Sequence, residues 1–181
     1  MKYITKEIWA DWNSKDEKVR QNSFEESNRR FKVYEEELEK LRPKLGEDNF
    51  NFFRSGLHDG KVISFNVGEG IDLDYEREET FSLEEFSETK VRIEVLEAYF
   101  EDIYLLKYEQ IQKVIFDFPT DNPLFWGKTI GDWGYDELSA IENDYFRHEV
   151  LFSSGTTILI EFQKFSFSKR QCKRSCHPKR P

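Results

Sequence analysis

Residues 145–167 read YFRHEVLFSSGTTILIEFQKFSF, and this stretch decides the fold class. Polar and apolar residues alternate on both sides of Ser153-Ser154-Gly155, a triplet that favours a tight turn. Alternation with a period of two is typical of strands that bury one face. The stretch therefore predicts an antiparallel hairpin formed by residues 145–152 and 157–167, with a register change near Lys164.

The same alternation recurs upstream of this hairpin. Its clearest example is Ile71-Asp72-Leu73-Asp74-Tyr75-Glu76, which follows an apolar run ending at Gly68-Glu69-Gly70. The two glycines indicate a hairpin turn at that point. We expect strands at 62–67, 71–76 and 91–95, one or two more within 103–118, and another within 133–142.

The first part of the chain has a helical period instead. Residues 15–42 contain neither Gly nor Pro, Ser14 or Asp16 is a suitable N-cap, and Pro43 and Gly46 indicate the end. A second short helix is expected at 47–54. One apolar stripe runs along the long helix and consists of Phe24, Phe31, Tyr34, Leu38, Leu41 and Leu45.

Together these patterns predict one α+β domain, in which N-terminal amphipathic helices precede a mostly antiparallel β-sheet. Residues 1–56 form the helical segment, which packs on the sheet, and residues 57–168 form the sheet region of the same domain. Residues 169–181 contain six Lys or Arg and no acid. Their composition predicts a disordered basic tail.

Composition places the chain among soluble cytoplasmic proteins. Aromatic residues make up 16% of its 181 residues, enough to build a core, and charged residues make up 35%. The sequence lacks both the apolar run of about 20 residues that a membrane span needs and a signal peptide. Cys172 and Cys176 are the only cysteines, so no disulfide framework is expected.

The charge distribution favours a basic protein as partner. Without the six cations of residues 169–181, residues 1–168 contain 21 basic and 36 acidic residues, a net charge of −15. A domain with this charge repels nucleic-acid phosphates and attracts cationic surfaces. We therefore expect no nucleic-acid binding and no membrane binding.

An acidic strand face is the candidate binding surface. Asp72, Asp74 and Glu76 project from the same face of the strand predicted at 71–76. They are interpreted either as contacts for a cationic partner or as the solvent face of the sheet, where charges oppose edge-to-edge aggregation.

Histidine and carboxylate residues provide a candidate metal site. His58-Asp59 precedes the first strand, and His148 lies in the hairpin. Imidazole and carboxylate groups are suitable metal ligands, provided that the fold brings them together. A structural interpretation stands beside this one: Asp59-Gly60 forms a turn, and His58 bonds to a backbone group.

Motifs of catalysis and of cofactor binding are not found in the sequence. It contains no Gly-x-Ser-x-Gly elbow, no Gly-x-Gly-x-x-Gly loop and no Gly-Lys-Ser/Thr sequence. No catalytic residue is therefore assigned. A divalent metal bound by His58, Asp59 and His148 is the one cofactor considered.

Several short segments resemble a family of uncharacterised cytosolic proteins from Bacillus-like bacteria. They are residues 1–9, the long charged helix, Leu57-His58-Asp59 at the start of a strand, and residues 146–155 with the alternating strand that follows them. The resemblance covers most of residues 1–168 and implies no assigned activity. The Leu-His-Asp strand entry is also similar to one in small immunity proteins of bacterial toxin systems.

Three functions remain open on the sequence alone. The leading hypothesis is a non-enzymatic binding protein, similar to an immunity protein, that acts through its acidic sheet face. The second is a small metal-dependent hydrolase that uses His58, Asp59 and His148. The third is a structural or oligomerising protein that associates through the stripe from Phe24 to Leu45. The oligomeric state itself is not predicted.

Overall fold

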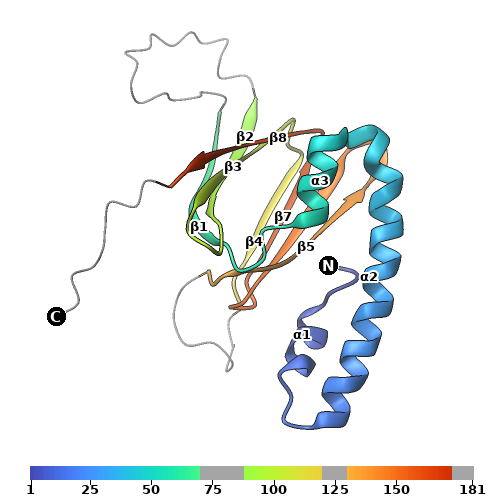
Figure 1. Cartoon of the computed structure of the whole chain (residues 1–181). Coiled ribbons are helices and arrows are strands. Elements are labelled where there is room, and N and C mark those ends of the chain that lie inside the picture. The colour runs from blue at the N-terminus through green and yellow to red at the C-terminus, as the bar shows by residue number, and fades with distance from the viewer. Residues whose placement is uncertain (70–87, 120–129, 173–181) are drawn as a thin grey trace, which may run out of the picture.

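Three N-terminal helices precede two antiparallel four-stranded sheets in the computed structural model, which describes residues 1–69, 88–119 and 130–172 (Figure 1). This arrangement confirms the predicted α+β class. One sheet has the strand order β1-β2-β3-β8, and the other has the order β4-β7-β6-β5. The strands are β1 (Lys61–Glu69), β2 (Thr89–Leu96), β3 (Asp102–Glu109), β4 (Lys113–Asp117), β5 (Trp133–Ala140), β6 (Phe146–Phe152), β7 (Thr157–Phe162) and β8 (Lys164–Gln171).

The chain passes from one sheet to the other at two places, and these passages join the two sheets. β3 continues into β4, and β7 continues into β8, so that β3 pairs with β8 while β4 pairs with β7. The second passage occurs at Gln163, whose N–H donates to the Glu109 carbonyl at 3.3 Å while Lys164 is also paired with Glu109. Two residues opposite one form a β-bulge, which bends the strand. The register change predicted near Lys164 is thereby confirmed.

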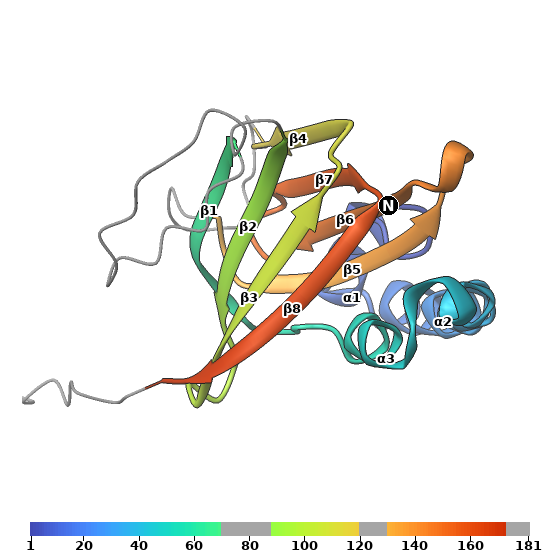
Figure 2. The same ribbon diagram turned by 90° about the horizontal axis from the view of Figure 1, so that it is seen from above.

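A second junction links β5 to β1. Lys61 forms an isolated bridge with Asp132, and the N–H of Trp133 donates to the Gly60 carbonyl at 2.7 Å. The strands thus curve around a single interior, as the view from above shows (Figure 2). Aromatic and aliphatic side chains from both sheets fill it, among them Val91, Ile93, Leu106, Tyr108, Trp133, Phe152, Ile158 and Phe162.

The helices are α1 (Lys6–Trp12), α2 (Glu17–Leu45) and α3 (Glu47–Ser55). The Asp16 side chain caps α2, as expected, by accepting from the N–H groups of Lys18 and Val19. α2 continues past Pro43, so the prediction that Pro43 marks its end is wrong. The helix ends at Leu45, before Gly46, so the other predicted end signal is confirmed; the φ of 75° at Gly46 suits a residue without a side chain.

The apolar stripe of α2 packs within the chain. Tyr34, Leu38 and Leu45 are buried in the common core, and α2 contacts β5. The Tyr34 hydroxyl accepts a hydrogen bond from the Leu138 N–H at 2.9 Å and thereby satisfies a donor of β5. Only the N-terminal end of the stripe is open, where Phe24 is 57% exposed. Most of the surface that the oligomerisation hypothesis needs is therefore occupied by the domain itself.

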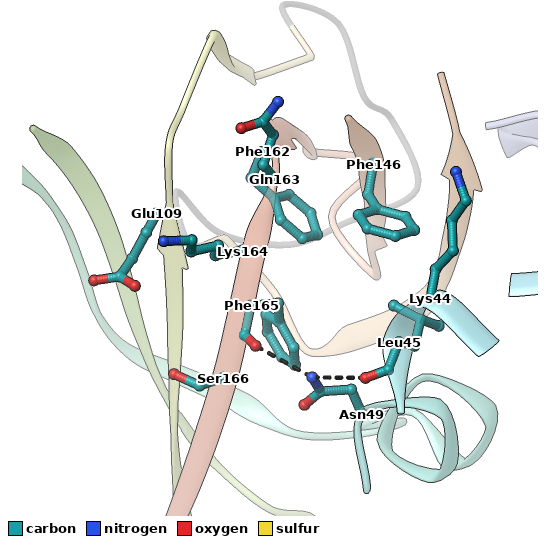
Figure 3. Close-up of a pocket in the computed structure, with 10 residues that line it drawn as sticks. All are labelled: Lys44, Leu45, Asn49, Glu109, Phe146, Phe162, Gln163, Lys164, Phe165 and Ser166. Carbon is teal, nitrogen blue, oxygen red and sulfur yellow. Dashed lines mark hydrogen bonds between the residues drawn. The ribbon is translucent and has the colours of Figure 1, made fainter. Parts of the chain in front are cut away.

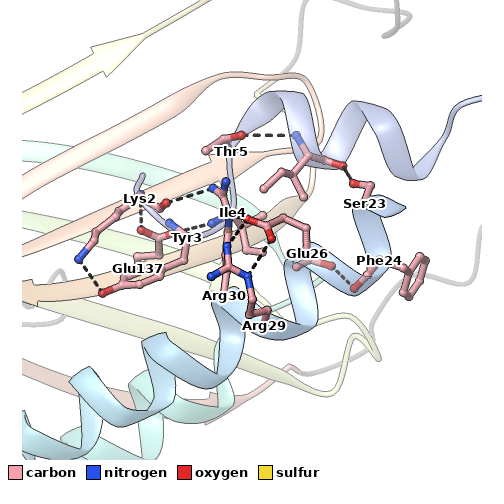
Figure 4. A network of polar contacts seen from close by, with 12 residues as sticks. Lys2, Tyr3, Ile4, Thr5, Ser23, Phe24, Glu26, Arg29, Arg30 and Glu137 are labelled. Carbon is pink, nitrogen blue, oxygen red and sulfur yellow. Dashed lines mark hydrogen bonds and ion pairs between the residues drawn. The ribbon is translucent and has the colours of Figure 1, made fainter. Parts of the chain in front are cut away.

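One carboxylate fixes the N-terminal segment to β5. Glu137 is buried, and its two carboxylate oxygens accept hydrogen bonds from the backbone N–H groups of Lys2, Tyr3 and Ile4 at 2.7–2.8 Å (Figure 4). Hydrogen bonds to an ionised acceptor are among the strongest in proteins. This arrangement holds the start of the chain against β5 and so positions α1.

An ion-pair cluster on α2 lies beside this segment. Glu26 accepts from Arg29 and from Arg30, and these hydrogen bonds lower the pKa of Glu26 to about 2. Arg30 also donates to the carbonyl of Lys2 at 3.5 Å (Figure 4). The cluster therefore connects α2 to the N-terminal segment.

Two predicted boundaries differ from the structure. Gly68 and Glu69, predicted as a turn, are part of β1 and pair with β2; residues 71–76 lie outside the described residues. β8 extends beyond residue 168 to Gln171, into the segment predicted to be a disordered tail. The extension continues the pairing with β3, and the side chains of Lys169 and Arg170 also form ion pairs with carboxylates of β3 and β2.

Among the described residues, no helix combines the length and the apolar character that a membrane crossing requires.

Candidate binding groove between α3 and β8

His148, one of the three residues of the predicted metal site, lies in a buried chain of hydrogen bonds. Its Nδ1 is 2.9 Å from the Tyr108 hydroxyl, and its Nε2 is 3.2 Å from Asp136 Oδ2. The other oxygen of Asp136 accepts from the Trp133 indole N–H at 2.9 Å. Because a carboxylate only accepts, Nε2 carries a proton, and in the neutral imidazole Nδ1 then accepts from Tyr108. Burial raises the pKa of the Tyr108 hydroxyl, as does the charge of Asp136 to a lesser extent, so Tyr108 stays protonated.

This chain of hydrogen bonds leaves His148 no nitrogen for a metal. The imidazole is fully buried, and the rings of Phe53 and Trp133 pack against it at centroid distances of 5.1 and 5.9 Å. His148 and Glu149 are successive residues of β6 and point to opposite sides of the strand, and of the two only His148 is buried. His148 links the two sheets inside the core, because it contacts Tyr108 of β3 and Asp136 of β5.

His58 and Asp59 lie at the surface. His58 Nδ1 lies 2.6 Å from the Gly134 carbonyl, to which it donates, and the ring packs on Tyr135. Asp59 has a φ of 62°, as expected in a turn, and its carboxylate is 3.8 Å from His58 Nε2. The structural interpretation of His58-Asp59 is thus confirmed.

The described structure does not bring His58, Asp59 and His148 together as a metal site. Within residues 1–69, 88–119 and 130–172, no three His, Cys, Asp or Glu side chains form a group suited to holding a metal ion. The predicted binding residues Asp72, Asp74 and Glu76 lie outside the described residues.

A groove lies between α3 and β8, at a place that sequence reasoning did not identify. Three adjoining hollows of about 320, 400 and 280 Å³ follow it and share lining residues from one to the next. We call it the α3–β8 groove. Its principal lining residues are Leu45, Asp48, Asn49, Phe52, Tyr104, Phe165, Ser166 and Phe167.

Asn49 crosses this groove. Its side-chain amide donates to the Leu45 carbonyl and to the Phe165 carbonyl, each at 3.2 Å (Figure 3). The second bond matters because Phe165 belongs to β8, which is an edge strand of its sheet. A side-chain donor from α3 thus occupies a position at which a neighbouring strand would place a backbone N–H.

The floor of the groove is aromatic. Phe165 and Phe167 project from β8 on the side of α3, and the ring of Phe52 packs on both at 5.3 and 4.7 Å. Phe165 also contacts Phe53 and Tyr108, which in turn contact His148. These rings separate the groove from the buried hydrogen-bond chain.

Most charges at the end of the groove near β6 are already paired. Lys44 binds Asp144 at 2.7 Å, and this hydrogen bond lowers the pKa of Asp144. Glu109 binds Lys90 at 2.8 Å. Figure 3 shows Lys44 and Glu109 on opposite walls of this hollow.

One sequence pattern indicates residues that line the groove but does not show where the groove lies. Alternation in residues 157–167 predicts that Phe165 and Phe167 lie on an apolar side, and both pack against the core. The sequence does not show that the strand passes to the other sheet at Gln163, and this passage is what leaves β8 beside α3.

Comparisons with known proteins supply no function. No family model matches the chain, and no curated protein matches it. A crystal structure of an uncharacterized protein from Neisseria gonorrhoeae is similar over 61% of this chain and 98% of its own, at 16% sequence identity and a TM-score of 0.34.

Proposed function

We propose that this chain is a non-catalytic binding protein that receives an extended segment of a partner protein along the outer edge of β8, in the α3–β8 groove. Neutralisation of a basic toxin inside a bacterial cell, the role that the resemblance to immunity proteins implies, is one form that such binding would take.

The observation that carries this proposal is the direction of the backbone groups of β8. The Cys172 N–H, directly after β8, donates to Glu101 across the β3 side, whereas the Phe165 carbonyl faces Asn49 on the other side. Backbone groups of successive residues in a strand point in opposite directions. Phe165, Phe167 and Lys169 therefore direct their N–H and carbonyl groups away from β3, and no other described strand pairs with them.

The edge strand of the other sheet near the helices, β5, has more of its polar groups bound within the chain. The Tyr34 hydroxyl accepts from its Leu138 N–H, and the Glu137 side chain of β5 binds the N-terminal segment. On β8, the described contact of this kind is the single hydrogen bond from Asn49. Sheet edges are common sites for addition of a strand from another chain.

The features of the groove favour binding of an extended segment over catalysis. In strand addition, main-chain hydrogen bonds supply affinity, while hollows for alternate side chains supply specificity. The α3–β8 groove provides both, because outward backbone groups of β8 lie beside hollows lined by Phe165 and Phe167. The titratable His148 lies behind these rings and is fully buried.

Replacement of Lys169 by proline tests the proposal, because it removes a backbone N–H that points away from β3. Short random peptides displayed on phage are selected on the full chain, and the enriched peptides are synthesised for affinity measurements. Lys169→Pro removes an outward N–H and no ladder bond, because proline is accepted where a strand N–H faces away from its sheet. We expect Lys169→Pro to bind the selected peptides about tenfold more weakly than Lys169→Ala does.

Lys169→Ala is the matched control. Both variants lose the ion pair with Asp102, but only the proline variant loses the N–H. Thermal unfolding of both variants checks that the fold is retained. Equal peptide affinities for the two variants, or a selection that enriches no peptide, would contradict the proposal.

A further inference from the structure

The two hollows of the groove nearest α3 carry negative charge. Asp48, in the first turn of α3, lines both hollows, Glu47 lines one of them, and none of the described residues lining them is Lys or Arg. Glu47 is partly compensated by Arg42, whose guanidinium lies 3.6 Å away. Asp48 is exposed, and within the described part of the chain no cation pairs with it. The carboxylate of Asp48 is therefore available to a cation from outside.

Aromatic rings complete the hollow beside Asp48. The hollow has a volume of about 280 Å³ and is lined by Phe52, Tyr104 and Phe167. The ring of Phe167 stacks on Phe52 at 4.7 Å and on Tyr104 at 6.3 Å. The faces of aromatic rings attract ammonium and guanidinium groups, and a nearby carboxylate adds to this attraction.

Lys169, a cation on the strand beside this hollow, already has a partner. The ammonium of Lys169, which is paired in register with Tyr104, binds Asp102 at 2.9 Å. Arg54, on the last turn of α3, does not line the hollow.

A strand added to β8 would bring a side chain to this hollow. Side chains of a strand alternate between the two faces of its sheet, so every second residue of the added strand lies on the face of Phe167. That is the face on which α3 contacts β8 through Phe52. A residue of the partner placed beside Phe167 therefore points towards Asp48.

We infer that the hollow formed by Asp48, Phe52, Tyr104 and Phe167 takes a lysine or arginine side chain of the bound segment. This inference rests on the proposed function, because it assigns the chemistry of a segment bound along β8. It also places attraction for a basic partner on residues other than Asp72, Asp74 and Glu76.

Sequences of the selected peptides give the first readout. We expect Lys or Arg to be enriched at one fixed position. Acetylation of a lysine at that position, or its replacement by alanine, is expected to weaken binding about tenfold, because it removes the charge that aromatic faces and a carboxylate attract. A rise in salt concentration should weaken binding of the basic peptide more than that of the acetylated one.

Variants of Asp48 give the second readout. Asp48→Lys should weaken binding of the basic peptide about tenfold and leave binding of the acetylated peptide nearly unchanged, because it places like charge beside the bound cation. Glu35→Lys, on an exposed part of α2, is the matched control for the change in net charge and should have little effect. Asp48 is exposed, so both variants are expected to fold.

The outcomes separate the two proposals. If peptides bind and Lys169→Pro still weakens them, but no basic residue is enriched and Asp48→Lys has no effect, the cation site is refuted and strand addition stands. If the selection yields no peptide, or if Lys169→Pro and Lys169→Ala bind equally, strand addition fails and the cation site fails with it.

Discussion

Glu137→Gln is expected to lower the free energy of unfolding by about 3 kcal/mol. The carboxylate accepts hydrogen bonds from the backbone N–H groups of Lys2, Tyr3 and Ile4, and its side chain is buried. The amide of glutamine offers one oxygen in place of two and turns an N–H₂ group towards these donors. At least one buried donor then has no acceptor, and the remaining bonds lose the charge that strengthens them.

Urea denaturation of the variant and the parent measures this loss. Glu142→Gln, at an exposed position, is the control and should change the free energy of unfolding by less than about 0.5 kcal/mol. Amide hydrogen exchange at Tyr3 and Ile4 should accelerate in Glu137→Gln alone. A loss below about 1 kcal/mol with unchanged exchange would mean that Glu137 does not hold the N-terminal segment.

His148→Leu is expected to have a similar effect, a loss of about 3 kcal/mol. Leucine has nearly the volume of histidine, so the change is mainly electrostatic. It leaves the Tyr108 hydroxyl without its acceptor and Asp136 without one of its two donors, both in the core between the sheets. His58→Leu should cost about 1 kcal/mol or less, because His58 is half exposed and water can replace its partner.

A double-mutant cycle identifies the cause of this loss. Tyr108→Phe removes the hydroxyl that His148→Leu leaves unpaired. The double variant should therefore be less destabilised than the sum of the two single variants, by about 1 kcal/mol. Additive losses would show that the hydrogen bond between Tyr108 and His148 contributes nothing of its own.

The fold class could be predicted because local patterns determine it. Alternation in residues 145–167 gave the hairpin, and the spacing from Phe24 to Leu45 gave the long helix with one buried face. The arrangement of the sheets could not be predicted. It depends on the bulge at Gln163, where the sequence indicates a register change but not the passage to another sheet, and on a bridge between Lys61 and Asp132, which has no distinct sequence pattern.

The candidate groove could not be located for the same reason. Its walls come from α3 and from β8, and only the folded chain brings Asn49 to Phe165, which is 116 residues away in sequence. The histidines are candidate site residues in the sequence because imidazole is a common metal ligand. In the fold, one of them supports the core and another binds a backbone carbonyl.

Amide hydrogen exchange of β8, with and without a selected peptide, tests the central claim most directly. The account predicts that the peptide slows exchange at Phe167 and Lys169, whose N–H groups point away from β3, and leaves Ser166 and Ser168, which pair with β3, unchanged. Unchanged exchange at Phe167 and Lys169 in the presence of bound peptide would contradict the claim that β8 receives a partner strand.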